Sequence, residues 1–343
     1  MRGMNLSKSR TPLLRRFGAS PLLSLLVLAC AFVFSGVGVT AQQPATVAAP
    51  DAQASPALLK WFVTVTDGQG RFIDGLTKDD FKVFEGKSER EIAYFEKSNA
   101  PASVAILLDV SGSMESKGVK IAQLTAARFI EQADARNAYY VGDFYTKWRE
   151  LTGWTQDAKA LIAALRKAGT HTEEETKALR SVGLTALHDA CLGALEKLER
   201  APHPKRVLLV ITDGGTDNAS THKLSELRQR LKASDVLLYT IAIDFGNQGI
   251  FNQEGQQNLD ELTRISGGRA FFPATAPEIV EVVDRAALEL RNQYVVGFAP
   301  ASAAAAGKWN KVKIKVEPRA KIFKKLWARS REGYFSTATK NTP

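Results

Sequence analysis

The chain has 343 residues and a formal net charge of +10, with apolar residues at 45% and charged residues at 24%. These values are ordinary for a globular protein. They exclude a collagen-like chain, a long coiled coil and a membrane protein with several spans. The length is sufficient for one large domain and a smaller one.

An export signal is predicted at residues 1–41. Five basic residues precede an uncharged stretch, Pro21–Val39, and small residues follow up to Ala41. Cleavage after Ala41 is favoured, although a stretch of 19 residues is also long enough to stay in a bilayer as an anchor. Lipid modification of Cys30 is a third option, in a poor position because hydrophobic residues follow it. We therefore expect an exported protein, secreted or held in the periplasm or cell envelope.

Removal of the signal changes the charge and the cysteine content of the chain. Residues 42–343 have a net charge of +5, because the first 41 residues contain five basic residues and no acidic one. One cysteine remains, Cys191, so no internal disulfide can form. The four histidines lack the spacing of zinc ligands. No basic run alternates with aromatic residues as in nucleic-acid binding proteins, so no nucleic-acid partner is expected.

Two β-rich segments flank the centre of the chain. Residues 42–57 are rich in alanine, proline and glutamine, which predicts a flexible linker, and residues 337–343 form a tail. The segments 58–100 and 292–336 are each expected to supply about three strands, one of them being RSREGYF near the end. Neither segment is large enough to bury a core alone. We therefore expect the two to pair into one small β-sandwich-like domain.

The central region, residues 101–291, alternates between predicted strands and helices of ten to sixteen residues. SVAILLD and RVLLVITD are apolar runs that are typical of strands buried on both faces of a parallel sheet. Helical periodicity follows each of them. This pattern predicts a doubly wound, Rossmann-like α/β domain, with a mostly parallel sheet and one antiparallel edge strand.

Both apolar strands end in an aspartate, Asp109 and Asp213. Ligands collect at the carboxyl ends of strands in an open parallel sheet, so these carboxylates are expected on one edge. Ser111 and Ser113 follow the first strand, and Thr185 precedes a helix. All five groups offer oxygen atoms, which suits a hard divalent cation such as Mg²⁺, Mn²⁺ or Ca²⁺.

DVSGS at 109–113, GLT at 183–185 and TDGG at 212–215 together resemble the von Willebrand factor type A (VWA) domain. The resemblance covers about Ser103 to Arg291, and the flanks resemble a family of secreted bacterial VWA-related proteins. It implies a metal-ion-dependent adhesion site with the metal ligands Asp109, Ser111, Ser113, Thr185 and Asp213, and with Mg²⁺ as the first choice of cation. In that family an acidic side chain of a protein partner completes the coordination. The resemblance therefore implies protein binding and no enzymatic activity.

Simpler interpretations of the same residues remain open. Aspartate and serine are common loop residues and can cap a loop without binding a metal. His188 can line the metal site, but a packed, hydrogen-bonded histidine is the more usual case. Cys191 lies on the apolar side of a predicted helix and is expected to be a core residue.

Four further features could contribute to the metal site or to the binding of a partner. Glu173–Glu175 can overhang the metal face, or they can start a solvated helix. KIFKKLWARSR, residues 321–331, can contact an anionic surface, although a strand with a polar face is favoured. Asp217 and Asp244 can join an outer shell around the cation and are not counted as ligands.

Three functions follow from these residues. The first is an exported module for divalent-metal-dependent protein binding, in adhesion or assembly. The second is a structural subunit of an envelope assembly, in which the metal only stabilises the fold. The third is a metal-assisted hydrolase, which is disfavoured because the sequence has no G-x-S-x-G, H-E-x-x-H or phosphate-loop motif. No small-molecule substrate is expected.

Overall fold

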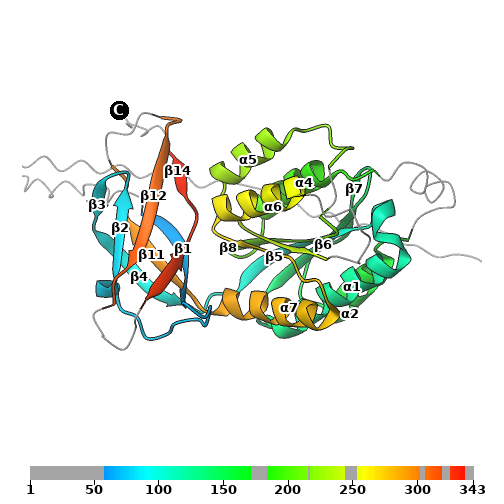
Figure 1. The fold of residues 1–343 in the computed structure, drawn as a ribbon, viewed down its shortest axis with the longest axis horizontal. Coiled ribbons are helices and arrows are strands. Elements are labelled where there is room, and N and C mark those ends of the chain that lie inside the picture. Colours follow the sequence, from blue (N-terminus) through cyan, green and yellow to red (C-terminus); the bar gives the residue numbers. More distant parts are fainter. Residues whose placement is uncertain are drawn as a thin grey trace, which may run out of the picture. The chain divides into compact units, whose positions relative to one another are not determined.

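The computed structural model describes residues 58–170, 184–214, 217–243, 253–301, 306–318 and 325–336. The predicted export signal, linker and tail, as well as Glu173–Glu175 and Asp244, lie outside these ranges. Figure 1 shows a central α/β layered domain and a separate pair of antiparallel sheets. None of the helices in the described ranges is long and apolar enough to span a bilayer.

The α/β domain is built on a six-stranded sheet with the order β10-β9-β8-β5-β6-β7. All neighbouring pairs are parallel except β6 with β7, so the predicted antiparallel edge is confirmed. The strands are β5 (Ala102–Asp109), β6 (Ala138–Phe144), β7 (Trp148–Thr155), β8 (Lys205–Thr212), β9 (Leu237–Ala242) and β10 (Arg269–Phe271).

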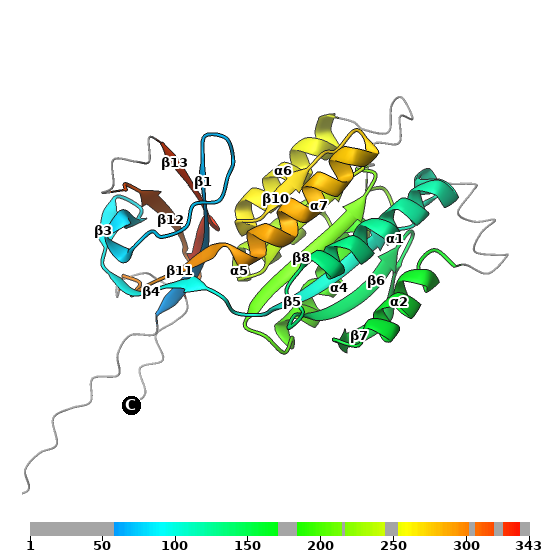
Figure 2. The same ribbon diagram turned by 90° about the horizontal axis from the view of Figure 1, so that it is seen from below.

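Helices cover both faces of this sheet, as the alternating pattern predicts (Figure 2). One face packs against α1 (Glu115–Gln132), α2 (Ala158–Lys167) and α7 (Ala276–Arg291). The other packs against α4 (Leu187–Glu199), α5 (Leu224–Ala233) and α6 (Gln253–Ser266). The strand β5 is buried along its whole length, with Ile106 in the first core and Leu107 in the second. Alternate side chains of a strand point to opposite faces, which explains its unbroken apolar run.

The two flanks form two antiparallel four-stranded sheets, with the orders β13-β1-β11-β4 and β14-β12-β2-β3. Each sheet takes strands from both flanks, and the sheets share one core around Trp61, Phe298 and Tyr334. The predicted β-sandwich-like domain is therefore present. Its strands are β1 (Leu59–Asp67), β2 (Phe81–Glu85), β3 (Ser88–Arg90), β4 (Ile92–Ser98), β11 (Gln293–Phe298), β12 (Trp309–Val316), β13 (Leu326–Arg329) and β14 (Gly333–Phe335).

Two expectations about these flanks are wrong. Each flank supplies four strands instead of about three. The additional strand of the first flank is β3, which is short and polar, and that of the second flank is β13. The run RSREGYF is not one strand, since β13 ends at Arg329 and β14 begins at Gly333. The chain changes sheets between these two residues, so the intervening residues cannot continue either ladder.

A buried ionic cluster joins α7 to the sandwich. Glu289 is fully buried and accepts hydrogen bonds from Thr64 Oγ1 in β1 at 3.2 Å and from the Tyr239 hydroxyl in β9 at 2.5 Å. The guanidinium of Arg329 in β13 also pairs with it. Burial, followed by the neighbouring Glu289 charge, raises the pKa of Tyr239 well above its usual value. The cluster satisfies an acid and a base that would otherwise be buried alone.

Cys191 lies in the core on α4 with 2% of its surface exposed, as predicted for a small core residue. Burial raises the pKa of its thiol to about 12. We expect the folded chain to react with iodoacetamide at pH 8 at least about 100-fold more slowly than the unfolded chain. Mass spectrometry over time measures this ratio. The variant Ser88→Cys supplies an exposed reference thiol, and equal labelling of both thiols in the folded protein would contradict the buried assignment.

Candidate metal-binding site

Asp109 ends β5 at the carboxyl edge of the parallel sheet and is completely buried. The backbone N–H of Ser111 donates to its Oδ1 at 3.0 Å, and the Thr212 hydroxyl donates to its Oδ2 at 2.7 Å. Thr212 is the last residue of β8, which lies next to β5 in the sheet. The carboxylate is therefore held by its own loop and by the neighbouring strand.

Two serine hydroxyls lie together in the loop that follows β5. Ser111 Oγ and Ser113 Oγ are 3.1 Å apart, and Ser111 has only 2% of its surface exposed. A short 3₁₀ turn at Gly112–Met114 brings them together, with the N–H of Met114 donating to the carbonyl of Ser111 at 3.1 Å. The turn therefore places both hydroxyls side by side just after the end of β5.

Asp213 follows β8 directly and has 2% of its surface exposed. Burial and, second to it, the negative charge of Asp213 raise the pKa of Asp109 to about 7. The two carboxylates are therefore close enough to repel each other, as expected for neighbouring strand ends of one sheet. A cation between them would remove this repulsion. Gly214 has a φ of 73°, a conformation that favours glycine, and its N–H donates to the Thr212 hydroxyl at 3.1 Å.

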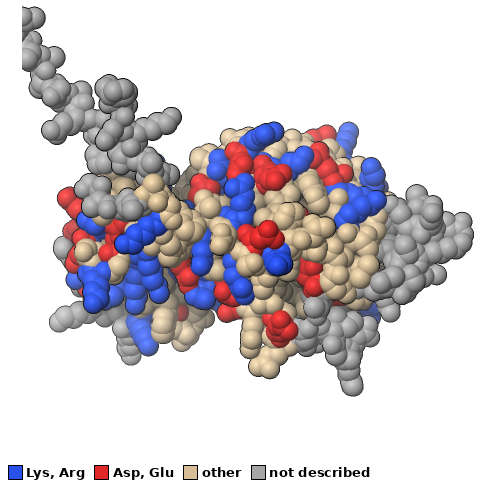
Figure 3. Space-filling model, turned by 90° about the horizontal axis from the view of Figure 1, so that it is seen from above, with Lys and Arg blue, Asp and Glu red and all other residues tan. Residues whose placement is uncertain are grey.

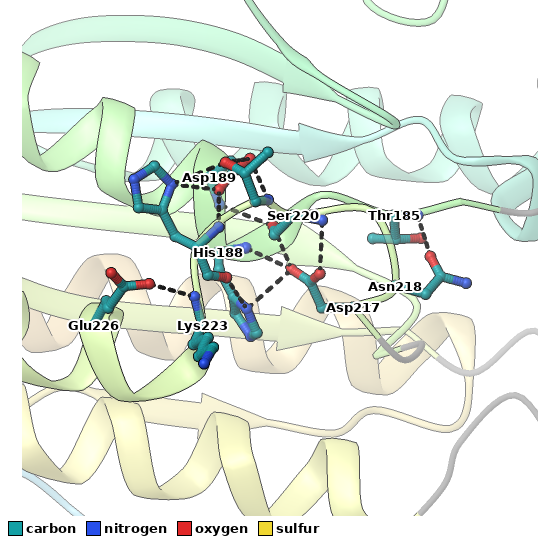
Figure 4. Close-up of polar contacts among 10 residues, drawn as sticks. Thr185, His188, Asp189, Asp217, Asn218, Ser220, Lys223 and Glu226 are labelled. Carbon is teal, nitrogen blue, oxygen red and sulfur yellow. Dashed lines mark hydrogen bonds and ion pairs between the residues drawn. The ribbon is translucent and has the colours of Figure 1, made fainter.

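Thr185 lies just before α4 and is buried, with 3% of its surface exposed. Its N–H donates to Asn218 Oδ1 at 2.8 Å, and its carbonyl accepts from the N–H groups of Asn218 and Ala219, each at 3.1 Å. The next N–H, that of Ala186, donates to the carbonyl of Tyr145 after β6 at 2.6 Å. The Thr185 loop is thus joined to the loops after β8 and β6. Asn218 contacts Thr185 twice, through its side-chain oxygen (Figure 4) and through its backbone N–H.

The loop after β8 also caps the first turn of α4. The N–H of His188 donates to Asp217 Oδ2 at 2.7 Å, and the N–H of Asp189 donates to Ser220 Oγ at 3.0 Å. Ser220 Oγ in turn donates to Asp217 Oδ2 at 2.7 Å, which links the two contacts (Figure 4). Free N–H groups at a helix start need such partners. Asp217 therefore has a structural role in fixing the loop that holds Thr185.

The two histidines of this region make local contacts. His188 Nδ1 lies 3.2 Å from the carbonyl of His222 and 3.4 Å from Asp217 Oδ2, which matches the packed, hydrogen-bonded interpretation. His222 Nδ1 lies 2.7 Å from Asp189 Oδ1, and this hydrogen bond raises the pKa of His222. Asn218 and Asp189 are not among the site residues predicted from the sequence. The only local signal was the run of polar loop residues after TDGG.

The donor chemistry of the candidate ligands fits a hard cation. Among the described residues, no group of three or more histidine, cysteine, aspartate or glutamate side chains could hold a metal. The five candidates combine two carboxylates with three hydroxyls and contain no sulfur or imidazole. Hydrogen bonds join Asp109 to Ser111 and Ser111 to Ser113, while the charge of Asp213 acts on Asp109. The described hydrogen bonds of Thr185 join it to the loop of Asn218, and none of them joins it to the other four candidates.

Comparison with known families supports the resemblance. The family model for the von Willebrand factor type A domain matches residues 103–285, more than half of the chain. The chain belongs to the VWA domain family. The matched residues contain the whole central sheet except for Ala102, together with the candidate ligands. No curated protein matches the chain.

Several solved structures are similar to this VWA protein at low identity. BatB from Bacteroides thetaiotaomicron is 15% identical, with 55% of this chain and 98% of that chain covered and a TM-score of 0.41. A von Willebrand factor type A protein from Catenulispora acidiphila is 11% identical, with coverages of 84% and 76% and a TM-score of 0.46. The pilus adhesin SpaC from Lactobacillus rhamnosus GG is 10% identical, with coverages of 75% and 48% and a TM-score of 0.42.

Proposed function

We propose that this protein is exported and binds a protein partner through a divalent cation held at a metal-ion-dependent adhesion site. The observation that carries the proposal is the approach of two buried carboxylates, Asp109 and Asp213, at the carboxyl edge of a parallel sheet. Two like charges that are buried close together repel each other. A divalent cation between the strand ends explains why both are acidic.

The proposed ligands divide into two chemical groups. Ser111, Ser113 and Thr185 offer neutral hydroxyls, and Asp109 and Asp213 offer the negative charge. When Mg²⁺ is bound, it supplies a positive centre that attracts an acidic side chain of the partner, and Mn²⁺ or Ca²⁺ can take its place. The role of this chain is to hold the oxygens in position, and Thr212 and Asn218 support that role by orienting Asp109 and Thr185.

Export and envelope location belong to the same proposal. The signal at residues 1–41 delivers the chain, and the linker at 42–57 separates the folded part from the envelope if the signal is retained as an anchor. Binding to another protein in adhesion or assembly is consistent with membership of the VWA family. We assign no catalytic residue.

A pull-down from native membranes tests this function. The tagged chain is incubated with the membranes once in Mg²⁺ and once in EDTA. A partner that is retained only in Mg²⁺ supports metal-dependent binding. If partner binding survives EDTA while the melting temperature falls strongly, the metal only stabilises the fold and the envelope-subunit alternative replaces this proposal. Turnover of an ester or phosphate panel that EDTA abolishes would favour the hydrolase.

The hydrogen bond between Thr185 and Asn218 leads to a specific prediction about Mg²⁺ affinity. Asn218→Ala removes the side-chain acceptor for the N–H of Thr185, so the loop loses part of its fixed position. Residues that orient metal ligands typically affect affinity by about 10- to 100-fold when they are replaced. We expect a loss of Mg²⁺ affinity in that range by calorimetry. Asn258→Ala on α6 is the matched control, and equal affinity in both variants would show that Thr185 does not need this contact.

A further inference from the structure

Positive charge is concentrated in one segment of the chain, Lys308–Lys325. It contains eight lysines and arginines and a single glutamate, which gives a net charge of +7. Residues 42–343 as a whole have only +5, so everything outside this segment sums to −2. Such a block on an otherwise slightly acidic protein indicates attraction to an anionic partner.

The strand β12 arranges part of this charge on one face of the sandwich. Lys311, Lys313 and Lys315 are exposed, while Val312 and Ile314 between them are buried in the core. Side chains two residues apart on a strand lie about 7 Å from each other, so the three ammonium groups form a row. Figure 3 shows lysine and arginine side chains gathered over the sandwich at the left of the view.

The neighbouring strand adds a fourth lysine and an aromatic ring. Lys82 of β2 lies opposite Lys315, and Phe84 lies opposite Lys313. Lys82 pairs with Glu317 at 2.9 Å, the single acid of the segment. None of the lysines in the row Lys311, Lys313 and Lys315 forms an ion pair with another described residue. The Lys315 Nζ lies 4.8 Å from the centre of the Phe84 ring.

An exposed tryptophan follows the basic segment. Trp327 in β13 has 54% of its surface exposed, and the Lys325 Nζ lies 4.4 Å from the centre of its ring. Tryptophan rings prefer the interface between a membrane and water, where one side is apolar and the other is wet. The predicted polar face of this C-terminal strand is therefore interrupted by a large apolar group beside a cation.

We propose that the basic face, defined as Lys311, Lys313 and Lys315 of β12, binds the surface of an anionic phospholipid bilayer. Each basic residue close to an anionic membrane surface raises the partition coefficient by about fivefold. The contact uses no residue of the metal site.

Vesicle binding tests the proposal. The chain from Gln42 contains every described residue, and residues 55–343 form one compact unit. It is mixed in EDTA with phosphatidylcholine vesicles, with or without 30% phosphatidylglycerol, and sedimented. We expect retention only on the vesicles that contain phosphatidylglycerol, with release as salt is raised. The triple variant Lys311→Gln, Lys313→Gln and Lys315→Gln should lower the partition coefficient by about 100-fold or more.

A matched triple variant controls for net charge. Lys120→Gln, Lys159→Gln and Lys167→Gln remove three exposed lysines from α1 and α2, and circular dichroism checks the fold of both variants. The control triple should sediment like the unaltered chain. Equal losses in the two triples, equal binding to neutral vesicles, or displacement by soluble polyphosphate at the same charge concentration would overturn the proposal. The last result would assign the face to a soluble polyanion.

Discussion

Asp109→Ala is expected to abolish the calorimetric heat of Mg²⁺ and Mn²⁺ binding, with an affinity at least about 100-fold below that of the unaltered chain. The reason is that Asp109 contacts the serine loop, through the N–H of Ser111, and the end of β8, through the hydroxyl of Thr212. Its loss removes a carboxylate and also frees the serine loop. The partner recovered in Mg²⁺ should be lost in the same variant.

A control separates this effect from a general loss of charge. Asp260→Ala removes an exposed acid from α6, far along the chain from the strand ends. This variant should bind the cation with unchanged heat, and thermal unfolding followed by circular dichroism should show that both variants fold. Equal heats in Asp109→Ala and the unaltered chain would refute the site, whatever happens to partner binding.

Glu289→Ala is expected to lower the free energy of unfolding by about 3–5 kcal/mol. The substitution leaves the partly buried guanidinium of Arg329 without its acid and removes the acceptor for Tyr239 and Thr64. Arg329 would retain its contact with Tyr239 and those with backbone carbonyls, such as that of Gly267 at 2.8 Å. Urea denaturation measures the change.

Two further variants of α7 serve as controls for this loss of unfolding free energy. Glu281→Ala removes an exposed acid of α7 and should change the free energy of unfolding by no more than about 0.5 kcal/mol. Glu289→Gln keeps an acceptor oxygen and should give an intermediate loss. A Glu289→Ala variant as stable as Glu281→Ala would mean that the buried cluster contributes nothing to the fold.

The sequence by itself determined the architecture, and it predicts the proposed set of oxygen donors. Unbroken apolar runs require burial on both faces, and the alternation with helices leaves only a parallel sheet, so β5 and β8 and their carboxyl ends could be predicted. The pairing of the flanks followed from their size, since neither could bury a core alone. The oxygen donors are visible because aspartate and serine stand at fixed offsets from the strand ends.

Only the tertiary structure decided which polar groups meet. Asn218 holds Thr185 across 33 residues, and Glu289 pairs with Arg329 across 40. An asparagine or a glutamate can accept a hydrogen bond from many groups, and no local pattern selects one of them. The same applies to β3 and to the break between β13 and β14, where hydrogen bonds to distant strands define the elements. Local patterning fixes the elements that bury their own apolar residues, whereas polar contacts depend on surfaces that come together only when the chain folds.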